Sequence, residues 1–235
     1  MKFSKDTIEK LKNFAQINPS IWFDKGYKVK TLNPPKTIWG YTEIEDHIDS
    51  SFGVYDLHAF LDLLSMLGPE ATIEHDAEQN LIYMKNAYSQ INFLTATREA
   101  INDGYEVQEL KLPDPVLTFD LKADALNQII KIAKKTGVNA IAIESEKDKV
   151  MINGYQVAEI KRNLNDPKMF SMDVAPYDGT NKFKFFINMI NMIIPVMDYQ
   201  VSVYIVGVNM AVVFKTENST FMITLEITSE HDFDV

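Results

Sequence analysis

The sequence predicts an α+β protein built from two copies of one domain, and three observations predict this class. Two lysine-rich amphipathic segments, residues 2–17 and 121–136, align without a gap at an offset of 118 residues. Each segment is followed by strand-like runs, then by a neutral helical segment and further strand-like runs. Between the copies, Pro113 and Pro115 cannot donate ladder hydrogen bonds in a central strand, so we expect an extended connector there.

The first predicted helix lies in the opening stretch, "MKFSKDTIEKLKNFAQIN". Its apolar residues Ile8, Leu11 and Ala15 recur at i, i+3 and i+7, which is the spacing of one helical face. Lys5 and Lys12 fall on the opposite, polar face. The segment is therefore expected to bury one side and to expose its lysines.

The remainder of the first copy is predicted to contain a second helix and three strands. In "VYDLHAFLDLLSML" a short strand leads into a helix whose N-cap is Asp56, because aspartate side chains accept hydrogen bonds from the first free N–H groups of a helix. Strands follow at Ala71–Glu74, Leu81–Met84 and Ser89–Phe93.

The second copy begins with the second basic helix. The residues of its apolar stripe are Leu126, Ile129, Ile130 and Ala133. Its polar face carries Lys131, Lys134 and Lys135, and Gly137 is expected to end the helix. The equivalences at the offset of 118 include Phe3 with Leu121, Asp6 with Asp124, Ile8 with Leu126, Leu11 with Ile129, and Ala15 with Ala133.

After this helix the pattern of the first copy is repeated. "VNAIAIE" and "KVMING" are predicted strands joined by the charged turn Ser145–Asp148, and "FKFFINMINMIIPV" is a predicted strand and neutral helix with Asn188 at the cap. The last three strands are expected at Gln200–Val206, Met210–Lys215 and Thr220–Ile227. We therefore expect an N-terminal domain over residues 1–110, a linker over 111–116 and a C-terminal domain over 117–235.

Composition excludes several classes of protein. The 235-residue chain has no cysteine, which rules out disulfides, thiol chemistry and cysteine-based metal centres. The N-terminal segment is charged throughout and does not resemble a signal peptide. The charge-free stretches 185–197 and 199–214 are each too short to span a bilayer. These features predict a soluble intracellular protein that does not associate with membranes.

The charge is unevenly distributed along the chain. The formal net charge is −10, which taken alone argues against nucleic-acid binding. The two basic segments, however, carry +2 (residues 2–17) and +3 (residues 121–136), so the rest of the chain carries −15. Positive charge is thus confined to two equivalent places in the repeat.

No catalytic motif, phosphate-binding loop or cofactor-binding pattern is evident, so we expect no enzymatic activity and no cofactor. Acidic residues surround histidines at Glu74–Asp76, at Glu230–Asp232 and in "EIEDHID", and such clusters are candidate divalent-metal ligands. The simpler interpretation is that they are solvated turns and an acidic loop. A metal-dependent hydrolase is the least favoured hypothesis.

The lysines of the two basic helices have two interpretations. A lysine face on a single helix is most simply a solvated face. Because the lysine face recurs at equivalent positions of the repeat, contact with phosphates is as well supported as simple solvation. The only arginines are Arg98 and Arg162, and without arginine forks we expect diffuse, sequence-independent contacts rather than base reading.

Five stretches of the sequence resemble the sliding clamp of T-even-like bacteriophages, the processivity factor of the replicative polymerase. They are "MKFSKDTIEKLKNFAQIN", "VYDLHAFLDLLSML", "INGY", "YDGTNKFKFFINMINM" and the ending "SEHDF", and they occur in the same order over nearly the whole chain. The resemblance implies a head-to-tail homotrimer closed around double-stranded DNA, with helices lining the hole and antiparallel sheets outside. With two helices in each of six domains, twelve helices would surround the DNA.

The resemblance also implies functional residues and partners. The DNA-facing lysines would be Lys5, Lys10, Lys12, Lys131, Lys134 and Lys135. The implied partners are the polymerase, an ATP-dependent clamp loader and late-transcription sigma or co-activator factors, in the cytoplasm of the infected bacterial host. Partner peptides would dock in an apolar groove near the linker, and one wall of this groove is expected to comprise Val107, Leu110, Leu112 and Pro113. These four residues are equally well explained as closing the core beneath the linker.

One alternative of a different class remains open at the level of sequence. The chain could be an acidic interaction scaffold that forms no ring and whose lysine helices bind an acidic protein. A measurement of mass in solution separates the two hypotheses, because a ring requires a closed oligomer.

Overall fold

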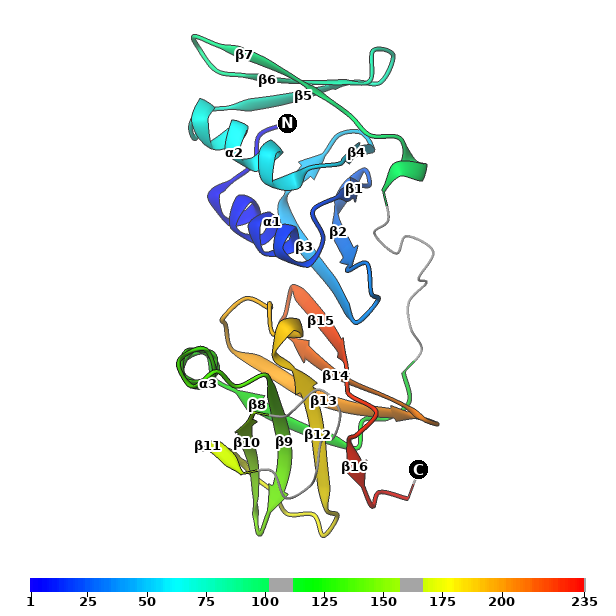
Figure 1. Ribbon diagram of the computed structural model, residues 1–235. Helices are drawn as coiled ribbons and strands as arrows, with labels where there is room; N and C mark the ends of the chain where they lie inside the picture. The colour runs from blue at the N-terminus through cyan, green and yellow to red at the C-terminus, as the bar shows by residue number, and fades with distance from the viewer. Residues whose placement is uncertain (102–111, 157–166, 235) are drawn as a thin grey trace. The chain divides into compact units, whose positions relative to one another are not determined.

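The computed structural model describes residues 1–101, 112–156 and 167–234, and the chain divides into two compact units (Figure 1). Unit 1 comprises residues 1–109 and 217–220, and unit 2 comprises residues 110–216 and 221–235. No helix in the described part of the chain is both long enough and apolar enough to cross a bilayer.

The helices confirm the offset between the two copies. Helix α1 starts at Lys5 and helix α3 starts at Ala123, which are 118 residues apart. The helical elements in the described residues are α1 Lys5–Ile17, α2 Leu57–Leu67, α3 Ala123–Thr136, and the short 3-10 helices η1 Arg98–Ala100 and η2 Met189–Asn191.

Unit 1 contains three sets of antiparallel strands. Strand β1 pairs with β4, β2 pairs with β3, and β5, β6 and β7 form a three-stranded sheet in that order. The strand bounds are β1 Ile21–Phe23, β2 Gly26–Leu32, β3 Ile38–Ile48, β4 Phe52–Val54, β5 Thr72–Asp76, β6 Leu81–Lys85 and β7 Gln90–Leu94.

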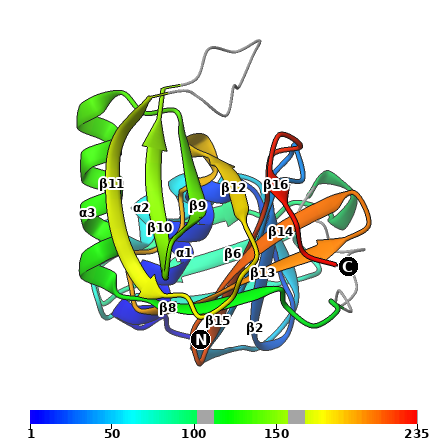
Figure 2. The same cartoon turned by 90° about the horizontal axis from the view of Figure 1, so that it is seen from below.

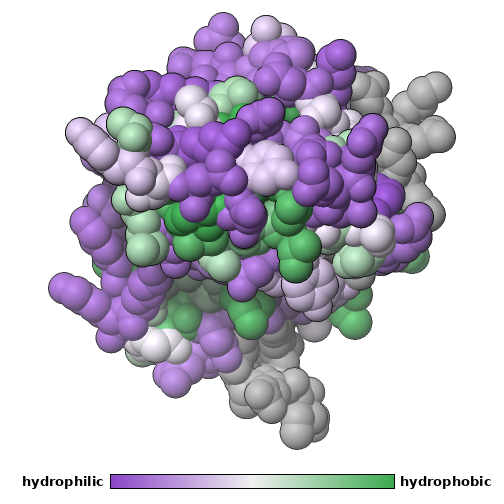
Figure 3. Space-filling model, turned by 90° about the horizontal axis from the view of Figure 1, so that it is seen from above, coloured by the Kyte–Doolittle hydropathy of each residue, from purple (hydrophilic) through white to green (hydrophobic). Residues whose placement is uncertain are grey.

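The core of unit 1 lies beneath α1 and α2. Leu11 and Phe14 of α1 are buried, and Phe60 of α2 packs edge-on against Phe93 of β7 with ring centroids 5.5 Å apart. Asp56 caps α2 as predicted, because its Oδ1 accepts a hydrogen bond of 2.9 Å from the Ala59 N–H. Seen from above, hydrophilic side chains cover most of this end of unit 1, with a few hydrophobic ones gathered between them (Figure 3).

The strands of the second half form two sheets. One has the order β11-β10-β9-β12-β16, and in the other β15, β14, β13 and β8 follow one another. The strand bounds are β8 Leu117–Leu121, β9 Ala140–Glu146, β10 Lys149–Tyr155, β11 Lys168–Pro176, β12 Phe183–Asn188, β13 Tyr199–Val206, β14 Asn209–Lys215, β15 Ser219–Thr224 and β16 Glu230–His231.

The core of unit 2 lies between α3 and the five-stranded sheet, along which α3 runs (Figure 2). Leu126, Ile129 and Ala133 are fully buried, and the first two meet Ile141 and Ile143 of β9 around a common cavity. The predicted stop at Gly137 is confirmed, because this residue adopts the left-handed conformation (φ 68°) that glycine tolerates without strain.

One predicted helix is absent from unit 2. The segment after β12 forms only the three-residue η2, although Asn188 does cap it by accepting a hydrogen bond from the Ile190 N–H. Pro195 explains the difference. It cannot donate a helical hydrogen bond, and it disfavours helical geometry at Ile194, so too few residues remain for a stable helix.

The strand predictions are confirmed in most places. The strands at 71–74, 81–84 and 89–93 correspond to β5, β6 and β7, and the charged turn between β9 and β10 has Lys147 at its positive φ of 55°. The last predicted strand ends earlier, at Thr224. Strand β11 was not predicted, and β8 begins at Leu117, directly after the predicted linker 111–116.

Candidate nucleic-acid interface

Helix α3 separates apolar and basic residues cleanly. Leu126, Ile129 and Ala133 face the core, whereas Lys131 and Lys134 are exposed on the other side. Lys135 is exposed beside them. Among the residues that the structure describes, no carboxylate lies within ion-pair distance of these three lysines. Within this part of the chain their charges are therefore not neutralised and are available to an external anion.

The position of these lysines on the helix is also favourable. Lys134 and Lys135 lie in the last turn of α3, where the carbonyl ends of the helix carry partial negative charge. A positive side chain there stabilises the helix slightly while its head group remains in solvent. The lysines can thus serve both the helix and a ligand.

The N-terminus of α3 is capped by a residue from another element. Asp198 Oδ1 accepts a hydrogen bond of 2.7 Å from the Ala123 N–H, and its Oδ2 lies 3.1 Å from Lys122 Nζ. The hydrogen bond from Ala123, followed by that from Lys122, lowers the pKa of Asp198 below its ordinary value. The carboxylate charge therefore sits where the helix dipole favours it.

Helix α1 presents its lysines differently. Lys10 Nζ lies 2.7 Å from Asp6 Oδ2 and donates a hydrogen bond of 3.1 Å to the Glu43 carbonyl oxygen on β3, and its side chain is only 19% exposed. Lys5 is 92% exposed and lies 3.9 Å from Glu9, a loose pair in solvent. Lys12 is exposed and has no ion pair among the described residues.

The six predicted lysines therefore fall into two groups. Five are exposed on α1 and α3, whereas Lys10 serves as a tether between α1 and β3. The sequence does contain a signal for part of this difference, because Asp6 lies four residues before Lys10 on the same helical face. The bond to the Glu43 carbonyl has no counterpart in the sequence pattern.

The predicted partner-binding residues lie at the edge of the described structure. Val107 and Leu110 fall outside the described residues. Leu112 is partly exposed and Pro113 is exposed, just before β8. Their role in binding partner peptides remains a prediction.

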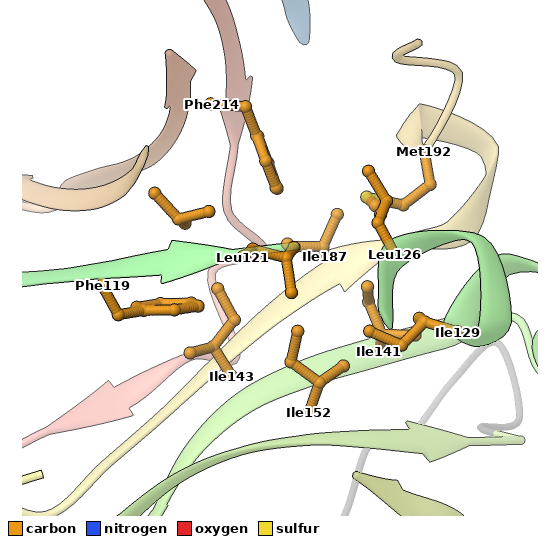
Figure 4. Close-up of a pocket in the computed structure, with 11 residues that line it drawn as sticks. Phe119, Leu121, Leu126, Ile129, Ile141, Ile143, Ile152, Ile187, Met192 and Phe214 are labelled. Atoms are coloured by element: carbon orange, nitrogen blue, oxygen red, sulfur yellow. The ribbon is translucent and has the colours of Figure 1, made fainter. Parts of the chain in front are cut away.

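The apolar cavity in unit 2 is a packing defect rather than a ligand site. Side chains of α3, β8, β9 and β12 converge on it (Figure 4). Its volume of about 10 Å³ is close to that of a single water molecule, and its lining is entirely hydrophobic. Such a cavity stays dry and cannot hold a substrate.

The acidic residues near the histidines have local structural roles. Asp46 Oδ2 accepts a hydrogen bond from the Ser4 N–H, Asp76 Oδ1 accepts from the Glu78 N–H, and Asp232 Oδ1 accepts from the Lys182 N–H. Within the described residues, no three histidine or carboxylate side chains are arranged to hold a metal ion.

Comparison with known proteins gives consistent matches. Residues 118–227 match the family described as gp45 sliding clamp, C terminal. The chain is 33% identical over 233 residues to the sliding clamp of Escherichia phage RB69, covering 99% of this chain and 100% of that protein. It is 31% identical over 235 residues to the sliding clamp of Enterobacteria phage T4, again covering 99% and 100%.

Among solved structures, the fold is similar to A. fulgidus PCNA with the C-terminal region of FEN-1 bound. The TM-score is 0.62 at 15% identity, covering 95% of this chain and 96% of that chain. At this identity the likeness concerns the fold alone, and it confirms the predicted α+β architecture of repeated clamp domains.

Proposed function

We propose, from the premise that this chain belongs to the phage sliding-clamp family, that it forms a closed ring around duplex DNA and tethers the replicative DNA polymerase for processive synthesis. Family membership confirms the resemblance found in the sequence. It also confirms that the chain is not an enzyme, since a sliding clamp is a processivity factor and catalyses no reaction of its own.

The observation that carries the proposal is the exposed lysine face of α3. Lys131, Lys134 and Lys135 are charged, unneutralised within the described residues and mounted on a helix whose other face is fixed in the core. They attract phosphates by a screened, sequence-independent interaction. Lys5 and Lys12 add the same interaction from α1. The acidic remainder of the chain repels DNA, so the duplex occupies the hole rather than the outer wall.

Weak contacts suit this function. A lysine on a flexible stem forms a point-charge contact that is easily exchanged between neighbouring phosphates. Retention then comes from topological enclosure, and the protein can move along DNA while it remains bound. Strong base-specific contacts would oppose sliding.

Ring closure requires sheet edges that are free to pair between subunits. In unit 1, the β5 edge is already occupied, because the Ile73 N–H donates to the Met1 carbonyl oxygen. Among the strands that the structure describes, the opposite edge, β7, has no partner beyond it. In the five-stranded sheet of unit 2, the edge strand β16 has two residues, whereas the strand at the other edge, β11, has nine.

We therefore assign the subunit contact to β7 of one protomer and β11 of the next. Because the two edges lie in different units, the contact is head-to-tail and can close a ring. Exposed apolar side chains on both strands, Leu94 at 75% and Met169 at 45%, support the assignment. We propose that three protomers close the ring, as the sequence resemblance implies. The domains of each protomer are residues 1–110 and 117–235, joined by the linker 111–116.

The remaining partners follow from the same premise. An enclosed ring needs an ATP-dependent clamp loader to open it, and late-transcription factors would use the loaded clamp as a mobile platform in the host cytoplasm. The solved PCNA structure, named for a bound region of FEN-1, is a precedent for peptide capture by this fold. Val107, Leu110, Leu112 and Pro113 stay our candidates for that contact.

The test is the mass of the purified protein in solution. We expect light scattering to give three times the 26.9 kDa chain mass at micromolar concentration. Replacing Asn92 in the middle of β7 by proline should abolish the trimer, because proline cannot donate a hydrogen bond across the edge. A wild-type protein that stays monomeric up to high micromolar concentration would favour the acidic scaffold instead.

A further inference from the structure

A cluster of charged side chains ties together four neighbouring strands of unit 2. Glu144 and Glu146 lie on β9, Lys184 on β12, Tyr155 on β10 and Lys168 on β11. Glu144 accepts a hydrogen bond from the Tyr155 hydroxyl, and its carboxylate lies 3.6 Å from Lys184 Nζ and 3.4 Å from Lys168 Nζ. Lys168 also pairs with Glu146.

The centre of the cluster is buried, whereas the side chains of Lys168 and Glu146 are 35% and 42% exposed. The side chain of Glu144 is 9% exposed, that of Lys184 is 11% exposed, and Lys184 Nζ lies over the Tyr155 ring at 4.1 Å from its centroid. Burial pulls the pKa of Lys168 down, but the hydrogen bond that Lys168 donates to Glu146 and the charges of both glutamates raise it above its ordinary value overall. Lys168 therefore stays charged beside the buried Glu144 carboxylate.

Lys168 reaches this cluster because β11 contains a bulge. Along the β10–β11 pair Gly154 lies opposite Phe170, but the next residue, Tyr155, lies opposite Lys168, so Met169 is skipped. Residues that are directly opposite point to the same face of a sheet, so a regular ladder would have placed Met169 beside Tyr155. The bulge turns the Lys168 side chain towards the glutamates.

A second feature fixes the same strand position from the other face. The Phe170 ring lies directly over Gly154, and a side-chain carbon at residue 154 would collide with it. A shift of β11 by one residue would remove Phe170 from this site and would separate Lys168 from Glu144. Since a one-residue slip also exchanges the two faces of a strand, both features oppose it.

We propose that the Met169 bulge and the Lys168–Glu144–Glu146 cluster form a device that fixes the register of β11, and thereby the register in which this edge accepts the neighbouring subunit. The inference rests on the proposed role of β11 in ring closure. An edge strand is held by one neighbour only, so its register is weakly specified unless side chains specify it. Buried ion pairs are best known for this kind of register selection.

The experiment compares the two ends of β11. In Lys168→Met the aliphatic stem is kept and the buried carboxylate loses a partner. The matched control is Lys149→Met, which removes the ion pair between Lys149 and Asp173. The side chains of these two residues are 49% and 47% exposed. We measure the protein concentration at which half of the trimers dissociate, and the amide exchange rate across Phe170–Asp173.

We expect Lys168→Met to raise both quantities about tenfold, because the buried Glu144 carboxylate loses one of its two lysine partners and Glu146 loses its ion pair. Lys149→Met should change either by less than about threefold, as is usual for exposed ion pairs. If wild type is a trimer and Lys168→Met has the same dissociation concentration and the same exchange rates, the proposed register device is refuted while the ring is not. A monomeric wild type would instead refute the ring, and the exchange rates in the monomer would still decide whether Lys168 fixes the strand.

Should Lys168→Met fail to fold, Glu146→Gln provides the second variant. This change weakens the contact between Lys168 and residue 146 and leaves Glu144 with Tyr155, Lys168 and Lys184 as partners. Amide exchange across Phe170–Asp173 should therefore rise about threefold. An unchanged exchange rate in Glu146→Gln would contradict the proposal.

Discussion

Helices α1 and α3 occupy equivalent positions in the repeat but use their lysines in different ways. Both begin at the same place in their unit, and Leu11 and Ile129 are buried at equivalent positions. In α1, Lys10 forms an ion pair with Asp6 and donates a hydrogen bond to the Glu43 carbonyl oxygen. In α3, no described carboxylate neutralises the three lysines of the exposed face. We therefore expect α3 to supply most of the attraction for DNA, and α1, which is tied to its sheet through Lys10, to contribute less.

The largest expected effect comes from removing the α3 charges. Changing Lys131, Lys134 and Lys135 to glutamine should lower the amount of clamp that the loader places on DNA by at least about tenfold, because the open ring loses the phosphate contacts that guide the duplex into the hole. Each lost contact should also reduce the salt dependence of loading. The measurement is the amount of clamp retained on circular DNA after loading at several salt concentrations. Glutamine is preferred to glutamate because a negative charge in the last turn would also oppose the helix dipole.

The matched control uses two lysines away from both helices. Lys147 and Lys182 are exposed and form no side-chain ion pair within the described part of the chain, unlike Lys149, which is paired with Asp173. Their double change to glutamine should leave retention almost unaltered. Equal losses in the two variants would mean that total charge matters and that α3 has no special place beside DNA.

At Lys10 we expect a smaller effect, and we expect it on stability instead of on retention on DNA. Its change to methionine should lower the free energy of unfolding by about 1 kcal/mol, because the hydrogen bond to the Glu43 carbonyl is lost. Retention on DNA should remain close to that of wild type. Thermal unfolding and the retention assay check the two parts separately. Normal stability combined with poor retention would show that Lys10 contacts DNA after all.

The smallest expected effect concerns the caps of the two helices. In α1 the Ser4 hydroxyl accepts from the Thr7 N–H, so Ser4→Ala should cost about 1 kcal/mol at any pH. In α3 the cap is the Asp198 carboxylate, whose pKa is lowered. Its stabilisation is therefore present above the ordinary aspartate pKa and is lost as pH falls through the lowered value.

The pH dependence can be measured by amide exchange in the first turn of each helix. Exchange at the start of α3 should accelerate on acidification through the carboxylate range, and Asp198→Asn should remove most of this dependence. The start of α1 should respond much less through its cap. An acid response of the α3 start that is unchanged in Asp198→Asn would disprove the assignment of Asp198 as a charge-dependent cap.

Much of this architecture could be predicted from the sequence because it depends on local periodicity. The buried stripe of Leu126, Ile129 and Ala133 and the helix end at Gly137 both follow from residue types and spacings within one short segment. The absent helix after Asn188 was a wrong prediction, because apolar periodicity outweighed the signal of Pro195. Strand β11 was missed because an edge strand is specified by its partners: the bulge at Met169 and the pairing with Gly154 exist only in the sheet.

The candidate site was predictable to a similar extent. Exposure of Lys131, Lys134 and Lys135 follows from their place opposite the apolar stripe. The tether of Lys10 to β3 depends on a backbone carbonyl far away in the sequence, and no pattern announces it. The cap of α3 likewise comes from Asp198, which lies 75 residues from Ala123.

The central claim is that retention on DNA comes from enclosure, with the α3 lysines guiding the duplex. It is tested most directly by loading the wild-type protein, with its clamp loader and ATP, onto nicked circular DNA and then cutting the circle once. We predict stable retention on the closed circle at moderate salt and rapid loss after linearisation, since a ring slides off a free end. Equal retention on the circular and the linear DNA would contradict enclosure and would favour a protein that binds DNA by surface affinity alone.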